Sequence, residues 1–182
     1  MKHSKIAFLD RDGVINVDYG YVGKREDFVF LPNAVSGLKQ LSSLGYKIVI
    51  VTNQAGIARG YYTENDFHKL TSWMLSELQG RGVEIEDVRY CPHHPEGIVD
   101  QYRVVCSCRK PESGMITGYL KNADFAVNEM ILIGDKFSDL YSGKDAGIDK
   151  LFLISDNSVA DNCDEKLVFT VCSDLLNVVQ HL

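Results

Sequence analysis

Several features that would put the protein in a membrane, in an export pathway or on a nucleic acid are missing from its sequence. No apolar run in the 182 residues approaches the roughly 20 that a membrane-spanning helix needs. The stretch before the first apolar segment, Met1 to Ser4, is too short for a signal peptide, so we expect a cytoplasmic protein. The formal net charge of −6 argues against nucleic acids and anionic membranes as partners.

Internal repeats, low-complexity tracts and linkers are absent as well. Hydrophobic residues make up 45% of the chain and charged residues 24%, which is ordinary for a globular protein with a buried core. Length and composition therefore predict a single domain over residues 1–182.

Strand and helix patterns alternate along the chain. The predicted strands are 5–10, 47–52, 87–90, 130–134, 151–154 and 168–171, and the predicted helices are 33–44, 64–79, 114–122, 137–146 and 173–181. Asn33 and Thr63 stand at the N-cap positions of two of these helices, and Gly45 and Gly147 follow two helix ends. The alternation predicts an α/β fold with a doubly wound parallel sheet, covered by helices on both faces.

The first predicted strand ends in two closely spaced acids, Asp10 and Asp12, followed by Gly13. Side chains two residues apart on a strand point the same way, and two close carboxylates repel each other. Such a pair is expected beside a cation, or where one acid is a nucleophile and the other a general acid/base. The alternative, an acidic turn closed by Gly13, is disfavoured because three other segments carry residues suited to binding phosphate.

Each of these three segments supplies groups suited to phosphate. Thr52-Asn53-Gln54 follows an apolar run and offers a hydroxyl and amides, Arg109-Lys110 offers two cations, and Gly134-Asp135-Lys136 offers a further acid with Asp139 behind it. Ligands of an open parallel sheet bind outside the carboxyl ends of its strands. The four segments are therefore expected to meet, and the resulting set of groups predicts phosphoryl transfer through an aspartyl-phosphate.

The long connection 91–113 holds four candidate metal ligands in two close pairs, Cys91-x-His93 and Cys106-x-Cys108. Three thiolates and an imidazole satisfy tetrahedral zinc without an open position, which predicts a structural site. Buried free thiols and a disulfide are the alternatives, but the loop is polar and the expected compartment is reducing. The spacing does not choose between His93 and His94. Two further thiols, Cys163 and Cys172, are expected to be ordinary core or surface residues.

The order Asp10-x-Asp12, Thr52, Lys110, Gly134-Asp135 resembles the four-motif signature of the haloacid-dehalogenase superfamily. The sequences of segments 10–16, 52–60, 91–95 and 106–115 are similar to those of the D,D-heptose 1,7-bisphosphate phosphatases. The similarity runs from about residue 6 to about residue 147. The resemblance favours His93 as the fourth zinc ligand. The chain is too short for a large cap domain, so we expect a monomer with an open, loop-shaped site.

The resemblance implies a role for each motif. Asp10 is the nucleophile, Asp12 is the general acid/base, and Thr52 and Lys110 stabilise the phosphoryl oxygens. Magnesium is held by the Asp10 carboxylate, the Asp12 backbone carbonyl and Asp135. Two interpretations stay open for each of three residues. Asp139 holds a metal-bound water or caps the next helix, Lys136 orients Asp135 or reaches the phosphate, and Arg59 binds phosphate or lies on the surface.

The implied substrate is D-glycero-D-manno-heptose 1,7-bisphosphate, which would lose its C7 phosphate during heptose synthesis for lipopolysaccharide or S-layer. Implied substrate contacts are Asp18, Tyr19, Gly20, Tyr21, Thr52, Asn53, Gln54, Ala55, Lys110 and Lys136. The fork of Arg109 suits the second phosphate. The sequence differs from the pattern usual in this family at Tyr19 and at Glu112-Ser113. Histidinol-phosphate phosphatase and a non-enzymatic zinc-stabilised binding module are the alternatives, and the preferred anomer stays open.

Overall fold

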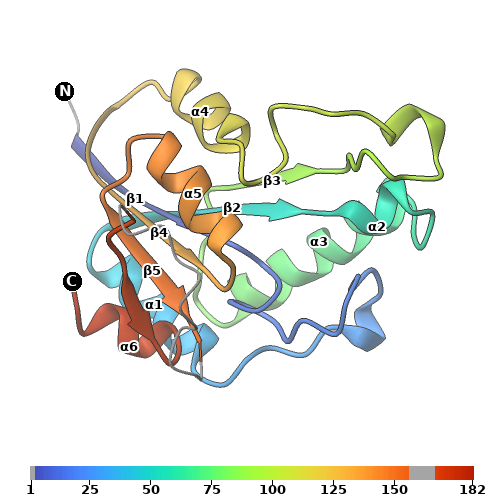
Figure 1. Cartoon of the computed structure of the whole chain (residues 1–182). Coiled ribbons are helices and arrows are strands. Elements are labelled where there is room, and N and C mark those ends of the chain that lie inside the picture. Colours follow the sequence, from blue (N-terminus) through green and yellow to red (C-terminus); the bar gives the residue numbers. More distant parts are fainter. Residues whose placement is uncertain (1–2, 156–166) are drawn as a thin grey trace.

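A six-stranded parallel sheet forms the centre of the computed structural model, which describes residues 3–155 and 167–182 (Figure 1). The strand order is β3-β2-β1-β4-β5-β6. The strands are β1 His3–Leu9, β2 Tyr46–Asn53, β3 Asp87–Cys91, β4 Ala126–Gly134, β5 Lys150–Ile154 and β6 Thr170–Cys172. The order reverses between β1 and β4, and this reversal is where a doubly wound sheet opens a crevice for ligands.

Helices cover both faces of the sheet, as the sequence predicted. The helices are α1 Ala34–Ser43, α2 Ala55–Ala58, α3 Glu64–Gly80, α4 Gly114–Lys121, α5 Phe137–Asp145 and α6 Leu175–Val179. Alternate residues of the central strands point to opposite faces, so Ala7 and Leu9 join the core under α1, α3 and α6, while Ile6 and Phe8 join the core under α4 and α5 (Figure 1). Both faces are apolar, which explains the nearly unbroken hydrophobic runs of β1 and β2.

Helix boundaries follow local chemistry, with one correction. Thr63 accepts from the backbone N–H of Asp66 at 3.1 Å and completes a capping box, as predicted. Asn33 occupies the N-cap position of α1, as predicted, but its side chain makes no capping bond: its backbone is left-handed at φ 63°, and its amide donates to Asp174 at 2.8 Å instead. The side chain of Asn33 therefore ties the start of α1 to the N-cap residue of α6.

Other differences concern lengths. Strand β4 begins at Ala126, earlier than expected, because its first residues pair with His3 and Ser4 before a register shift that skips Asn128 of β4. The final strand and helix are shorter than predicted, and the short helices α2, η1 (Arg25–Asp27) and η2 (Asp100–Tyr102) had no clear pattern. Cys163 lies outside the described residues, and Cys172 is buried at the end of β6. No helix in the described part of the chain is long and apolar enough to cross a membrane.

Candidate active site

The point where the strand order reverses carries two acids. Asp10 directly follows β1 and Asp135 directly follows β4, the two strands that meet at the reversal. The backbone N–H of Asp10 donates to the Ile133 carbonyl at 3.0 Å, which continues the ladder by one residue and fixes where the side chain starts. The predicted convergence at the carboxyl ends of the strands is therefore present.

Lys110 connects the segments at this edge. Its Nζ lies 3.0 Å from Asp10 Oδ1, 2.6 Å from Asp139 Oδ1 and 2.8 Å from the carbonyl oxygen of Val51. Burial disfavours the charged amine, but the two carboxylates outweigh this cost and raise the pKa of Lys110. The ammonium group is thus kept charged in a site that is almost closed to solvent.

The side chain of Asn53 holds the backbone of Lys110 in place. Its Nδ2 donates to the Lys110 carbonyl at 3.1 Å, and its Oδ1 accepts from the Lys110 N–H at 3.0 Å. This two-bond clamp joins the end of β2 to a loop that arrives 57 residues later in the chain. Asn53 therefore sets the position of Lys110, a role that the sequence motif did not reveal.

Three carboxylates gather beside Lys110. One oxygen each from Asp10, Asp135 and Asp139 lies within 4.8 Å of the others. Burial, together with the neighbouring acids, raises the pKa of Asp10 to about 7, although Lys110 opposes the shift. Burial likewise raises the pKa of Asp135 to about 6. Asp139 also accepts from the Lys136 N–H at 3.0 Å, so the helix-capping reading of Asp139 is met, and its pairing with Lys110 was not foreseen.

This acid cluster fits a small divalent cation. Asp135 Oδ1 is buried and has no hydrogen-bond partner among the described residues, so it keeps a lone pair that can coordinate a cation. Gly13 leaves room for the Asp135 carboxylate, because a Cβ at Gly13 would lie 2.3 Å from Asp135 Oδ2. Hard carboxylate oxygens are the ligands that magnesium prefers.

Asp12 is held by a separate set of donors. Arg11, itself 1% exposed, donates from Nη2 to both carboxylate oxygens at 3.0 Å, and Asn16 donates to Oδ1 at 2.9 Å. Gln54 Nε2 donates to Asp12 Oδ2 at 3.2 Å and to Thr52 Oγ1 at 2.8 Å. The side chain of Asp12 is thereby kept out of the three-acid cluster and near the end of β2.

A cavity of about 500 Å³ opens above these groups. The predicted site residues that line it are Asp10, Asp12, Asp18, Gly20, Tyr21, Asn53, Gln54, Ala55, Arg109, Lys110 and Lys136. Thr52 is fully buried and Tyr19 is 64% exposed, and neither residue lines the cavity. Three lining residues were not predicted: Tyr62, His94 and Ser138. His94 adjoins a predicted ligand and Ser138 adjoins Asp139, but nothing in the sequence pattern marked Tyr62.

The rim of the cavity carries further charged groups. Lys136 Nζ lies 2.9 Å from Asp18 Oδ2 and 3.6 Å from Asp135 Oδ2, so it reaches Asp135 while pairing with the predicted sugar-binding segment. Arg59 Nη2 lies 3.3 Å from His94 Nε2, and Arg109 Nη1 donates to the His93 carbonyl at a long 3.4 Å. Burial and the two nearby arginines lower the pKa of His94.

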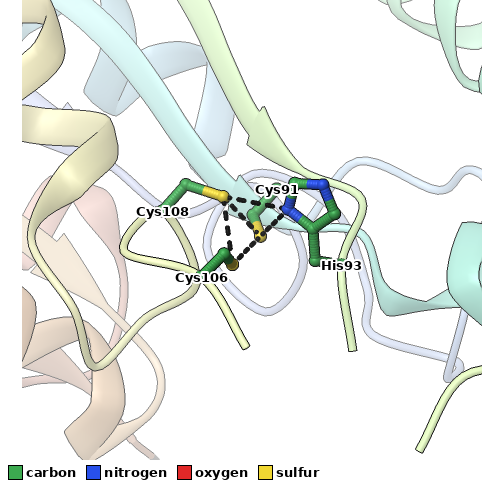
Figure 2. A group of neighbouring side chains, drawn as sticks. All are labelled: Cys91, His93, Cys106 and Cys108. Atoms are coloured by element: carbon green, nitrogen blue, oxygen red, sulfur yellow. Dashed lines mark hydrogen bonds between the residues drawn. The ribbon is translucent and has the colours of Figure 1, made fainter. Parts of the chain in front are cut away.

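Cys91, His93, Cys106 and Cys108 form one compact cluster, with all four donor atoms directed at a common centre (Figure 2). Cys91 ends β3, and its Sγ lies 3.5 Å from Cys106 and 2.9 Å from Cys108. His93 Nδ1 lies 3.3 Å from Cys108 Sγ. These separations far exceed the roughly 2.0 Å of a disulfide bond, and the donor set fits tetrahedral zinc.

The alternatives to His93 and to a metal site can now be compared with the geometry. The ring of His94 faces Arg59 and the cavity, while His93 completes the sulfur cluster. None of the four cysteines in the described residues, Cys172 included, forms a disulfide. Cys108 directly precedes Arg109 and Lys110, so the cluster adjoins the segment that carries both cations.

Comparisons with known proteins find phosphatases that are similar to this chain. A family model described as polynucleotide kinase 3 phosphatase matches residues 5–171. The D-glycero-alpha-D-manno-heptose-1,7-bisphosphate 7-phosphatase of Photorhabdus laumondii is 49% identical over 156 residues, covering 85% of each chain. The D-glycero-beta-D-manno-heptose-1,7-bisphosphate 7-phosphatase of Haemophilus ducreyi is 39% identical over 179 residues, covering 98% of each chain.

A solved structure is similar over nearly the whole chain. It is the D,D-heptose 1,7-bisphosphate phosphatase from B. bronchiseptica, complexed with magnesium and phosphate. It is 27% identical, superposes with a TM-score of 0.84, and the match covers 98% of this chain and 97% of that chain.

Proposed function

Because the chain belongs to the family of D-glycero-D-manno-heptose-1,7-bisphosphate 7-phosphatases, within the haloacid-dehalogenase-like phosphatases, we propose that it hydrolyses the C7 phosphate of this sugar bisphosphate. The observation that carries the proposal is one cavity lined both by the Asp10–Lys110–Asp139 cluster and by Arg109. The cluster suits phosphoryl transfer, and Arg109 suits a second phosphate group. Nucleotide-activated heptose synthesis is the pathway class that would use such a reaction.

Asp10 acts as the nucleophile in this proposal. Its Oδ2 is not engaged by Arg11 or Lys110, both of which contact Oδ1, so one oxygen is left to attack phosphorus. The attack forms the aspartyl-phosphate bond and breaks the bond between phosphorus and the C7 oxygen. Lys110 and a bound cation favour the ionised Asp10 that the attack requires, against the raised pKa of the carboxyl group.

Asp12 acts as the general acid and then as the general base. It gives a proton to the leaving C7 oxygen, and later takes one from the water that attacks the aspartyl-phosphate and releases inorganic phosphate. The donors around Asp12 hold its carboxyl group at one place on the cavity wall, which supports this role. Thr52 and Lys110 donate to the phosphoryl oxygens as negative charge builds on them.

Asp10, Asp135 and the backbone carbonyl of Asp12 would hold magnesium. When bound, the ion neutralises part of the repulsion between the carboxylates and an incoming phosphate dianion. Asp135 Oδ1, which has no hydrogen-bond partner among the described residues, supports this assignment. Lys136 holds the side chains of Asp135 and Asp18 in position through its two ion pairs.

A structural zinc ion would occupy the Cys91–His93–Cys106–Cys108 cluster. Four protein ligands leave no open position for a water, so the ion would fold the loop rather than take part in the reaction. The loop has little regular structure of its own apart from η2, and it carries Arg109 at the cavity. Holding this loop is therefore the way in which zinc would affect turnover.

The remaining substrate contacts follow from the cavity lining. Asp18, Gly20 and Tyr21 on one side and Asn53 to Ala55 on another are proposed to contact the sugar. Arg109, with His94 and Arg59 behind it, is proposed to bind the C1 phosphate. A histidinol-phosphate phosphatase would need an unpaired acid for the substrate amine, whereas Asp18 in this cavity is already paired with Lys136.

We also propose a single domain that works as a monomer in the cytoplasm. One continuous sheet runs through the described residues, which supports a single domain. Cys91, Cys106 and Cys108 form no disulfide with one another or with Cys172, which suits a reducing compartment.

Phosphate release from a panel of substrates tests the proposed function. The panel holds both anomers of the heptose 1,7-bisphosphate, histidinol phosphate and simple sugar monophosphates, each with magnesium. We expect the highest kcat/KM on one heptose bisphosphate anomer. The proposal fails if histidinol phosphate is the best substrate, and the comparison of the two anomers identifies the preferred one.

A further inference from the structure

Tyr62 lies at the end of a buried hydrogen-bond chain that reaches the reacting groups. Its hydroxyl donates to Gln54 Oε1 at 2.6 Å, and Gln54 Nε2 donates onward to Thr52 Oγ1 at 2.8 Å and to Asp12 Oδ2 at 3.2 Å. Gln54 is 1% exposed and Thr52 is 0% exposed. The amide of Gln54 thus uses both of its amide hydrogens within the protein and accepts one hydrogen bond at its oxygen.

The backbone is shaped to hold the ring of Tyr62. A Cβ at Gly23 would lie 2.2 Å from Tyr62 Cδ1, and a Cβ at Gly56 would lie 2.3 Å from Tyr62 Cε1. Any larger residue at either position would displace the ring. The ring packs with Ile57 and Phe67 in a small separate core, so its hydroxyl is delivered to Gln54 by packing on several sides.

The hydroxyl stabilises the orientation of the Gln54 amide that the Asp12 carboxylate requires. Burial raises the pKa of Tyr62, so the hydroxyl keeps its proton and can donate to Oε1. If the amide were turned over, its oxygen would face the Asp12 carboxylate, and two acceptors would be in contact. Asp12 therefore selects the orientation of the Gln54 amide, and the Tyr62 hydroxyl stabilises it by donating to Oε1.

We propose that Tyr62 is a positioning residue for phosphoryl transfer, acting through Gln54 on Asp12 and Thr52. Because Thr52 Oγ1 accepts from Gln54, its own hydroxyl hydrogen is left to donate to a phosphoryl oxygen. Because Asp12 Oδ2 accepts from Gln54, the carboxyl group is kept where it can reach the leaving oxygen. Gln54 then holds the side chains of Asp12 and Thr52 in position. This inference rests on the proposed roles of Asp12 and Thr52.

A double-mutant cycle tests the inference. Tyr62→Phe keeps the ring and removes the hydroxyl, and Gln54→Met keeps a side chain of similar shape without polar atoms. We expect Tyr62→Phe to lower kcat about five- to tenfold, the usual worth of one positioned neutral hydrogen bond, with KM changed less than about twofold. In the Gln54→Met background, Tyr62→Phe is expected to have no further effect, since the hydroxyl acts only through that amide.

Tyr119→Phe is the matched control. Tyr119 is also buried, but its hydroxyl has no hydrogen-bond partner among the described residues. It lies on α4, in the core on the other face of the sheet from α1 and α3. This variant is expected to keep the wild-type kcat. Melting temperatures are recorded for all variants.

The outcomes divide clearly. A kcat for Tyr62→Phe within twofold of wild type, or losses that multiply in the double variant, would overturn the inference. If Gln54→Met does not fold, Tyr62→Phe decides alone: a lower kcat at unchanged KM supports positioning, and a lower melting temperature at unchanged kcat overturns it. The cycle is also run on p-nitrophenyl phosphate. A wild-type protein that hydrolyses only this ester refutes the proposed substrate, while the cycle still decides the role of Tyr62.

Discussion

Asp139 holds the ammonium group of Lys110, with Nζ and Oδ1 2.6 Å apart and both side chains almost completely buried. Asp139 comes from the start of α5, whereas Lys110 comes from the loop before α4. The same Lys110 nitrogen contacts Asp10, so Asp139 shares the positive charge with the proposed nucleophile and limits how tightly Lys110 binds it.

Replacing Asp139 is expected to affect both stability and activity. Asp139→Ala removes one carboxylate from a buried ion pair and the acceptor for the Lys136 N–H, so the free energy of unfolding should fall by about 3 kcal/mol. Asp139→Asn keeps an acceptor and should lose less. Urea unfolding and kcat measure the two effects. The control is Asp149→Asn, which breaks an exposed pair with Lys144 and should cost about 0–1 kcal/mol. Equal losses in Asp139→Ala and Asp149→Asn would contradict the central place given to Asp139.

Asp10→Asn is expected to abolish phosphate release, because an amide oxygen cannot form the aspartyl-phosphate. Asp12→Asn should leave the fold and metal binding intact and slow turnover strongly, because proton transfer typically contributes about 10²–10⁴-fold. Initial rates with magnesium measure both. Near-normal turnover by Asp10→Asn would rule out an aspartyl-phosphate mechanism.

The raised pKa of Asp10 predicts how stability changes with pH in magnesium-free protein. The folded pKa of about 7 exceeds the usual 3.8, so folded protein binds a proton more tightly than unfolded protein between these values. Asp10 therefore contributes stability that is fully present below pH of about 4 and is lost as pH rises through about 7. Asp10→Asn lacks this titration, so it should gain stability relative to wild type over that window.

Chemical unfolding of both proteins in chelator, from pH 4 to 8, gives the difference curve. Added magnesium should favour ionised wild-type Asp10 and reduce the difference at neutral pH. A difference that stays flat with pH would mean that burial does not raise the pKa of Asp10.

The cysteine–histidine cluster predicts about one zinc per chain in protein purified without chelator. His93→Ala and Cys108→Ser should lose the metal, and His94→Ala should keep it, since His94 faces Arg59 and the cavity. Elemental analysis of the purified variants is the measurement. Wild-type protein free of zinc, or loss of zinc in His94→Ala alone, would contradict the assignment.

Arg109 separates a bisphosphate substrate from a monophosphate. Losing a charge-assisted pair to the second phosphate should cost roughly 1.5–3 kcal/mol, about ten- to a hundredfold in kcat/KM, on the bisphosphate only. Arg109→Lys should recover part of this, because a single ammonium lacks the two-pronged geometry. Equal losses for Arg109→Ala on the bisphosphate and on a sugar monophosphate, with a lower melting temperature, would instead mean that Arg109 only supports the zinc loop.

The sequence alone predicted the doubly wound sheet and the edge at which the site forms. Unbroken apolar runs before Asp10, Thr52 and Asp135 indicate buried strands, and parallel strands bring their carboxyl ends to one edge. The four sulfur and nitrogen donors could also be read locally, because two close pairs in one polar loop have few other uses. Each of these predictions was made from short segments of a few residues each.

Tertiary structure decided how the segments meet. The pairing of Asp139 with Lys110, the clamp from Asn53 to the Lys110 backbone and the reach of Tyr62 to Gln54 are made by side chains whose directions depend on packing between distant elements. Asn33 is the converse case: its sequence position favours a helix cap, yet its amide binds Asp174, 141 residues away, since the fold brings α6 beside α1. Local patterns fix the period and the direction of side chains within one element, but only the assembled core determines which partners come within hydrogen-bonding distance.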